Sequence, residues 1–136
     1  MTRSGRLRQR WDDGGMGFPA VLADEAFAYL TTTGRRSGLP REIEIWFVLS
    51  QDGTSVHVLA GAPDRAQWLA NARADPTVRV RIGGEERAGR AEVPEPGGVE
   101  DAAARAALVA KYTRGDGSDL QGWARRGGLL AIRVTC

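Results

Sequence analysis

Apolar and polar residues alternate along several short runs of this chain, and a period of two is typical of β-strands. The clearest run is Glu42 to Ser50, where Ile43, Ile45 and Phe47 occupy every second position. Shorter runs of the same kind follow and precede it. The pattern predicts six strands: Ala28–Thr33, Glu42–Ser50, Thr54–Ala60, Thr77–Ile82, Glu85–Val93 and Leu129–Val134.

Two longer segments have the features of helices. Asp64 is followed three residues later by Gln67, which has the form of a capping box and predicts a helix start. That helix should end near Ala74, because Asp75-Pro76 cannot continue it. An alanine-rich segment, Val99–Tyr112, predicts the second main helix.

The order of these elements indicates the fold class. Gln51–Gly53 and Gly83–Gly84 are turn sequences that join neighbouring strands as hairpins. Five to six mostly antiparallel strands with two main helices indicate an α+β small barrel rather than a parallel sheet. We expect residues 1–17 to form a flexible basic arm and residues 18–136 to form a single domain.

The composition narrows the class of protein. The chain has 136 residues, 42% of them hydrophobic and 26% charged, as in an ordinary globular domain. Its net charge of +2 is too small for a nucleic-acid-binding surface, so no nucleic-acid partner is expected. No secretory signal or membrane span is apparent, which favours a cytoplasmic location and leaves peripheral membrane contact open. The sequence leaves monomer and homodimer equally open.

The segment Thr31–Arg41 concentrates the candidate binding chemistry. It reads Thr-Thr-Thr-Gly-Arg-Arg-Ser-Gly-Leu-Pro-Arg, with three arginines and several hydroxyl groups between two predicted strands. A tight turn bounded by glycines is expected to leave backbone N–H groups unpaired. With arginine forks beside them, these groups predict a site for a phosphorylated or polycarboxylated ligand.

Other kinds of site are not indicated. His57 is a single histidine within a strand, without the companions that a zinc site needs, so no metal is expected. Cys136, at the end of the chain, is a poor nucleophile candidate. No Walker loop or dinucleotide-binding glycine pattern is present. An enzyme of this composition would therefore take its reactivity from a cofactor.

Two segments resemble one known family. Tyr29–Arg41 and Trp68–Val80, in this order and at this spacing, are similar to the deazaflavin-dependent nitroreductase family, also called the F420H2-dependent quinone reductase family. The resemblance implies a split β-barrel like that of FMN-binding flavoreductases, and coenzyme F420 as the ligand. It also implies hydride transfer to a small electron-poor acceptor: a quinone, an enone, a nitroaromatic compound or an unsaturated secondary metabolite.

The resemblance also implies roles for individual residues. The family's Gly-Arg-[Lys/Arg]-[Ser/Thr]-Gly turn holds the phosphate and acidic tail of the coenzyme, and its Trp-x-x-Asn helix shapes the coenzyme pocket. A tyrosine before the last strand lines the substrate side as a proton donor or orienting group. These roles fall on Arg35, Arg36, Ser37 and Arg41 for the tail, on Trp68 and Asn71 for the pocket, and on Tyr112 for the proton.

The chain departs from the family pattern in two places. Trp46 stands where an aromatic pocket residue is expected, and Glu44 lies on the same strand face. If Glu44 faced the pocket beside Trp46, burial would raise its pKa and make it a candidate acid; the alternative is an outward-facing glutamate. The segment after Leu59 is shorter than is usual in the family.

Two alternatives stay open. The barrel could bind F420, FMN or another anionic aromatic or lipid-like molecule without any redox step. FMN could also replace the deazaflavin as the cofactor of a reductase.

Overall fold

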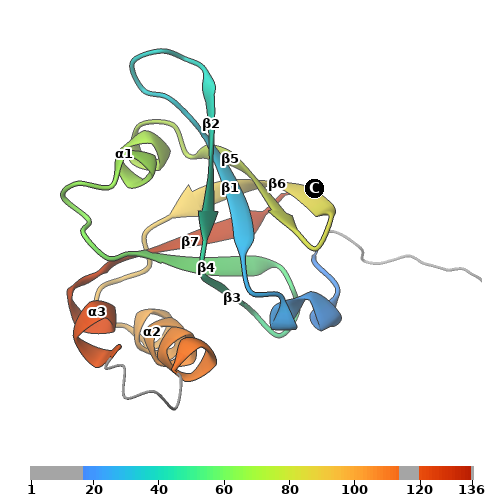
Figure 1. Cartoon of the computed structure of the whole chain (residues 1–136), viewed down its shortest axis with the longest axis vertical. Coiled ribbons are helices and arrows are strands. Elements are labelled where there is room, and N and C mark those ends of the chain that lie inside the picture. Colours follow the sequence, from blue (N-terminus) through green and yellow to red (C-terminus); the bar gives the residue numbers. More distant parts are fainter. Residues whose placement is uncertain (1–16, 114–119, 136) are drawn as a thin grey trace, which may run out of the picture.

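The computed structural model describes residues 17–113 and 120–135. Its sheet contains seven antiparallel strands (Figure 1), in the order β2-β1-β5-β6-β7-β4-β3. The strands are β1 (Ala28–Thr33), β2 (Pro40–Ile45), β3 (Phe47–Leu49), β4 (Ser55–Ala60), β5 (Thr77–Ile82), β6 (Glu85–Glu92) and β7 (Gly128–Val134). The helices are the 3₁₀ helix η1 (Ala20–Asp24) and the α-helices α1 (Gln67–Ala74), α2 (Val99–Tyr112) and α3 (Gln121–Arg126).

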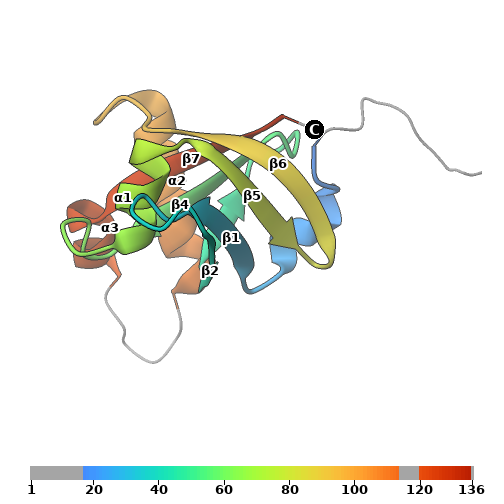
Figure 2. The same ribbon diagram turned by 90° about the horizontal axis from the view of Figure 1, so that it is seen from above.

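The sheet curls into a split barrel, which confirms the predicted α+β class with one strand more than expected (Figure 2). The extra strand is explained by residues 42–50, which were predicted as one strand and form parts of two, β2 and β3. β2 pairs with β1 at one edge of the sheet, whereas β3 pairs with β4 at the other edge. The chain passes between the edges at Trp46, so the sheet bends back on itself there.

The concave side of the sheet encloses the main hydrophobic core. Alternate residues of the strands point inward, as the period of two requires. The core is closed at one end by α1, which contributes Leu69 and Ala72. Its fully buried side chains include Leu30, Phe47, Val56, Val58, Val78, Val80, Ile82, Leu130 and Ile132.

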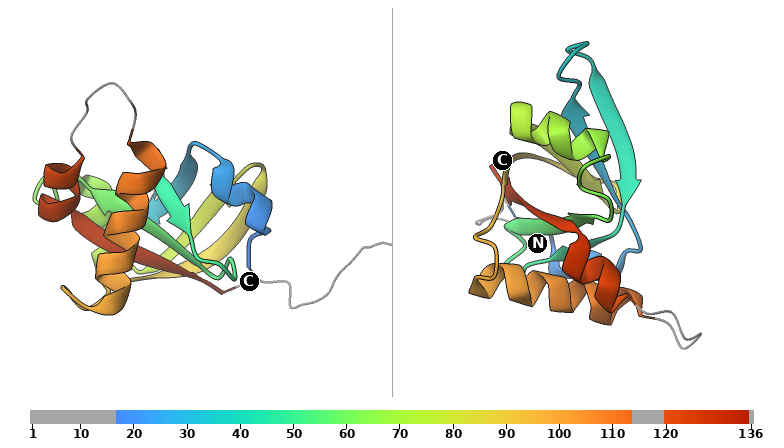
Figure 3. Two further views of the ribbon diagram at one scale, coloured as in Figure 1. Left: turned by 90° about the horizontal axis from the view of Figure 1, so that it is seen from below. Right: turned by 90° about the vertical axis from the view of Figure 1, so that its left-hand side faces the viewer.

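A second, smaller core lies on the opposite side of the sheet. There α2 packs on β3, β4 and β7, and α3 lies beside α2 (Figure 3). Its buried members are Leu59, Ala104, Leu108, Tyr112 and Leu129. The predicted second helix is confirmed with the bounds expected for it, whereas α3 was not predicted.

The predicted capping box of the first helix is wrong. Helix α1 begins at Gln67 rather than after Asp64, and Ala66 precedes it without a side-chain hydrogen bond to the cap. The predicted end is correct, because the Asp75 N–H closes the last turn on the Asn71 carbonyl. The hairpin turns are also confirmed: Gly53, Gly83 and Gly84 all have positive φ, which glycine adopts without strain.

Two expectations fall partly or wholly outside the described residues. They are most of the predicted basic arm, and Cys136 as a poor nucleophile candidate. No helix within residues 17–113 and 120–135 is long and apolar enough to cross a membrane.

Candidate functional site

The turn between β1 and β2 is closed by its own hydrogen bonds. The Gly34 N–H donates to the Leu39 carbonyl at 2.8 Å, and the Gly38 N–H donates to the Gly34 carbonyl at 2.8 Å. The Leu39 N–H donates to Ser37 Oγ at 3.1 Å. The expectation that this turn leaves its N–H groups unpaired is therefore largely wrong. Side chains, rather than a nest of backbone donors, must supply most of its anion-binding capacity.

Arg35 ties this turn to helix α1. Its backbone N–H and its Nη1 both donate to Asn71 Oδ1, at 3.1 and 2.8 Å, and its Nη2 donates to Gln67 Oε1 at 2.8 Å. Asn71 is only 5% exposed, so its amide is a fixed acceptor. All the hydrogen-bond acceptors of Arg35 are neutral, and the positive charge of the guanidinium is not compensated by them.

A pocket of about 340 Å³ lies between the turn and α1, and we name it the anion pocket. It is lined by Gly34, Arg35, Arg36, Ser37, Arg41, Ile43, Gln67, Trp68 and Asn71. Six of the residues predicted to contact a coenzyme therefore border one cavity: Arg35, Arg36, Ser37, Arg41, Trp68 and Asn71.

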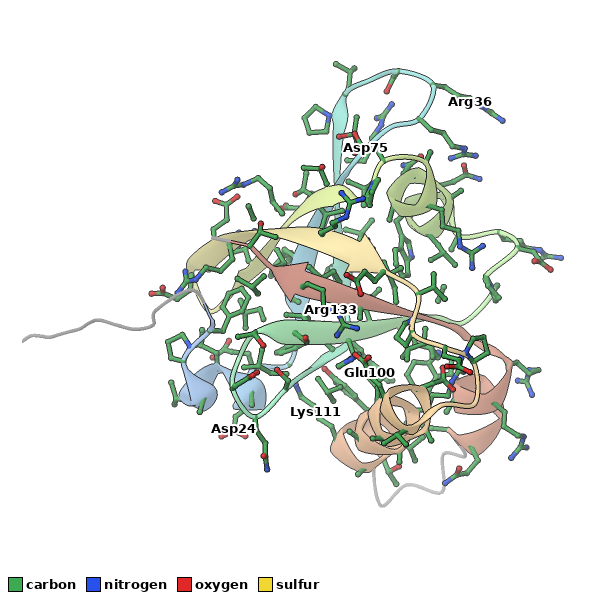
Figure 4. All side chains as sticks on the ribbon, turned by 180° about the vertical axis from the view of Figure 1, so that it is seen from behind. Asp24, Arg36, Asp75, Glu100, Lys111 and Arg133 are labelled. Atoms are coloured by element: carbon green, nitrogen blue, oxygen red, sulfur yellow. The ribbon has the colours of Figure 1, made fainter. Side chains whose placement is uncertain are left out.

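The two outer arginines of this pocket, Arg36 and Arg41, have no side-chain partner among the described residues. The side chains of Arg36 and Arg41 make no hydrogen bond or ion pair with any residue in the described ranges. Arg36 lies at the tip of the turn, away from the body of the protein (Figure 4). A β-carbon on Gly34 would lie 2.6 Å from Ser37 Oγ, so a larger residue there would require the Ser37 side chain to shift.

A second pocket, of about 440 Å³, adjoins the first, and we name it the apolar pocket. The two share Ile43 and Trp68, so they form one cleft that runs past the indole ring. Apart from Glu44 and Arg65, the lining of the apolar pocket is uncharged: Ile43, Ile45, Leu59, Ala60, Gly61, Ala62, Ala66 and Trp68. The cleft thus has one cationic end and one largely hydrocarbon end.

Glu44 is at the edge of the apolar pocket and is exposed. It accepts a hydrogen bond of 2.7 Å from the Tyr29 hydroxyl, and this bond raises the pKa of Tyr29. The guanidinium of Arg81 lies 4.4 Å from the centre of the Tyr29 ring. The burial that would have made Glu44 a strong candidate acid is absent.

Trp46 and Tyr112 lie apart from the cleft lining. Their rings stack with centres 4.2 Å apart and planes inclined by 5°, and Trp123 meets Trp46 edge-on at 5.7 Å. This group packs behind the wall of the apolar pocket, since a β-carbon on Gly61 would lie 3.1 Å from the Trp123 ring. Trp46 therefore supports the pocket from behind and does not line either cavity.

The Tyr112 hydroxyl is occupied by backbone groups. It accepts from the Phe47 N–H at 3.0 Å and donates to the Ala26 carbonyl at 2.8 Å. The side chain is buried, and this burial raises the pKa of Tyr112. A role as proton donor would require the hydroxyl to leave these two partners, so that role stays a prediction.

Sequence reasoning missed several residues of the cleft. Gln67 was assigned to a helix cap, although its side chain accepts from Arg35. Arg65 has no local motif, and its position beside Glu44 depends on how the loop before α1 folds. Within residues 17–113 and 120–135, no group of three or more His, Cys, Asp or Glu side chains that could hold a metal ion occurs.

Comparisons with known proteins show what this chain and its fold are similar to. The family model described as F420H(2)-dependent quinone reductase matches residues 2–135. An F420-H2 dependent reductase, FDR-A, is similar with 21% identity and a TM-score of 0.63, over 79% of this chain and 94% of that one. The heme storage protein HutZ from Vibrio cholerae is similar with 15% identity and a TM-score of 0.66, over 85% of each chain. A domain-swapped dimer is similar with 24% identity and a TM-score of 0.64, over 79% of this chain and 80% of that one.

Proposed function

Because this chain belongs to the F420H(2)-dependent quinone reductase family, we propose that it reduces a small electron-poor acceptor with F420H2 bound in the cleft described above. The single observation that carries the proposal is the anion pocket, where two unpaired arginines and one fixed arginine face the same cavity. Quinones are the first acceptor class to test; enones, nitroaromatic compounds and unsaturated secondary metabolites follow from the same chemistry.

The residues present fit this coenzyme. F420 carries a phosphodiester and a polyglutamyl tail, and guanidinium forks pair with phosphate and carboxylate groups in two-point contacts. Arg36 and Arg41 would hold the tail, since their donors are free. Trp68 and Ile43 would hold the ring system, because they join the cationic pocket to the apolar one.

The bound coenzyme supplies the redox chemistry: F420H2 gives up a hydride and a proton, so a quinone becomes a hydroquinone as F420 is formed. The protein orients the reactants and limits water at the apolar end of the cleft. Arg35 acts as a positioning residue, because its bonds to Asn71 and Gln67 fix the turn that presents Arg36.

Binding without turnover is the second candidate function. One observation favours it: the Tyr112 hydroxyl, predicted as the proton donor, is hydrogen-bonded to Phe47 and Ala26. In this candidate the cleft would still bind F420 or FMN, and the arginines would have the same role.

Coenzyme binding tests the anion pocket. We expect Arg36→Ala combined with Arg41→Ala to weaken F420 binding more than tenfold in a fluorescence titration, because two charge-assisted contacts are lost. Arg73→Ala is the matched control, since Arg73 is exposed in the last turn of α1 and borders neither pocket. Unchanged affinity in the double variant would remove the basis of the proposal.

Turnover separates the two candidate functions. We expect the protein to catalyse anaerobic oxidation of F420H2 by 1,4-naphthoquinone, measured as a gain in the visible absorbance of the oxidised coenzyme. Tight F420 binding without turnover on quinones, enones and nitroaromatic compounds would instead support the binding function. FMN is tested in parallel, because a flavin that stabilises the protein better than F420 would change the cofactor assignment.

A further inference from the structure

Arg65 is a charged residue of the cleft to which the proposed coenzyme site gives no role. It borders the apolar pocket, on the loop that leads into α1, and its side chain is exposed. We propose that Arg65 selects acceptors that carry an acidic group, so that the preferred substrates are planar conjugated anions rather than neutral quinones. This inference rests on the proposed function and names the substrate class for the same cleft.

The volume and lining of the apolar pocket suit a small, mostly apolar ligand. Its volume of about 440 Å³ is within the range of small-molecule sites, which are mostly apolar with a few placed polar groups. The half-buried ring of Trp68 and the side chains of Ile43 and Ile45 offer an apolar surface for a conjugated ring. An acceptor of this kind gains from leaving water in proportion to the apolar area that it buries.

The state of Arg65 points to an anion at the border of this pocket. Its side chain makes no hydrogen bond or ion pair with any residue that the structure describes, although arginines elsewhere in the molecule have carboxylate partners. Its backbone N–H donates to the Ala62 carbonyl at 2.9 Å, which leaves the guanidinium uninvolved. The guanidinium fork is therefore available for a carboxylate or sulfonate.

The second charged residue of the apolar pocket, Glu44, would determine the orientation of a bound acceptor. Glu44 is already hydrogen-bonded by Tyr29, and its carboxylate would repel an acidic group. An anionic acceptor would therefore place its acidic group toward Arg65 and its uncharged part toward Glu44.

An inert probe tests the binding step without turnover. The probe is 2-naphthalenesulfonate, and its neutral counterpart is 2-naphthalenemethanol, both measured by isothermal titration calorimetry. We expect Arg65→Ala to weaken sulfonate binding by about threefold to tenfold, the range for one exposed ion pair that forms two hydrogen bonds. Binding of the neutral compound should not change, and Arg65→Lys should restore part of the loss.

Two controls decide whether the anion binds where we propose. Arg73→Ala removes an exposed arginine of the same helix region and should leave the affinity for the sulfonate unchanged. Equal sulfonate affinity in the wild type and in Arg65→Ala would overturn the proposal. A loss that appears only when Arg36 and Arg41 are replaced would also overturn it, because the probe would then occupy the anion pocket.

A turnover measurement connects this preference to the reaction. With F420H2 supplied, the ratio of kcat/KM for 1,4-naphthoquinone-2-sulfonate to that for 1,4-naphthoquinone should fall about threefold to tenfold in Arg65→Ala. An unchanged ratio would contradict the inference. Turnover of neither quinone would contradict the proposed function, whereas the probe experiment would still decide the role of Arg65.

Discussion

Arginines of the cleft differ in what their guanidinium groups already bind. The Arg35 guanidinium donates hydrogen bonds to two side-chain amide oxygens of α1. In contrast, the side chains of Arg36, Arg41 and Arg65 have no partner among the described residues. A guanidinium that is already hydrogen-bonded to the protein can hold its neighbours in place, whereas one without such bonds is available to bind an anion. Residue type alone could not make this distinction, because all three arginines of the turn looked equivalent in the sequence.

Tyr112 gives a test at the scale of one hydroxyl group. We expect Tyr112→Phe to lower the free energy of unfolding by about 1–3 kcal/mol, because the buried Phe47 N–H and Ala26 carbonyl lose their shared partner. Chemical denaturation measures this change. For catalysis, a kcat that falls more than tenfold in the folded variant would support proton donation, and an unchanged kcat would exclude it.

At the scale of elements, the β1–β2 turn and helix α1 form one unit. The link is Asn71, whose single amide oxygen accepts two hydrogen bonds from Arg35 across 36 positions of sequence. The turn is otherwise an exposed hairpin end, so its orientation depends on this contact. The anion pocket exists because the two elements are held together along it.

Asn71→Ala should loosen the turn without removing an arginine. We expect faster amide hydrogen exchange in residues 34–39, because the turn would open more often. We also expect weaker F420 binding, because ordering a mobile turn reduces the free energy gained on binding. Gln67→Ala removes one hydrogen bond at an exposed position and leaves the buried Asn71 amide in place, so it should loosen the turn less than Asn71→Ala does. Arg73→Ala, which borders neither pocket, is the control. Exchange rates that match the wild type in Asn71→Ala would show that the turn orders itself independently of α1.

Sequence patterns predicted elements better than the junctions between them. The alternation in residues 42–50 is real on both sides of Trp46, but a period of two does not reveal that the strand changes partners there. Asp64 and Gln67 have the spacing of a capping box, but the helix begins only at Gln67. The Gln67 side chain instead accepts a hydrogen bond from Arg35, which is distant in sequence. The motif residues of the turn and α1 do line one pocket, although their role in binding a coenzyme stays a prediction. The place of Arg65 at the other pocket depends on how the loop before α1 folds.

At the scale of the whole molecule, one charged network joins α2 to the sheet. Glu100 of α2 accepts from Arg133 of β7 through Nη1 at 2.5 Å and Nη2 at 2.9 Å, and its Oε2 lies 2.6 Å from His57 Nε2 of β4 (Figure 4). Arg133 also donates to Glu92 of β6 at 3.1 Å. Three elements, α2, β4 and β7, thus meet at the Glu100 carboxylate, and Arg133 links β6 to the same network, so no local pattern could have predicted it.

The pKa of Glu100 makes this network testable through pH. The hydrogen bonds from Arg133 and then from His57 lower its pKa from 4.5 to about 2. Between these two values the unfolded chain binds a proton that the folded protein does not, so stability decreases as the pH falls from 4.5 toward 2. Above pH 4.5 the contribution of Glu100 is complete.

Glu100→Gln should therefore be less stable than the wild type at pH 7 and should approach it as the pH falls toward 2. We expect a difference of about 1 kcal/mol at pH 7, a modest value because 37% of the Glu100 side chain is exposed and solvent screens the pair. Urea denaturation across this pH range measures it, with Glu95→Gln as a control at an exposed carboxylate that has no side-chain partner in the described part of the chain. A stability difference that stays constant with pH would mean that the glutamine disturbs packing, and that the charge of Glu100 does not hold α2 against the sheet.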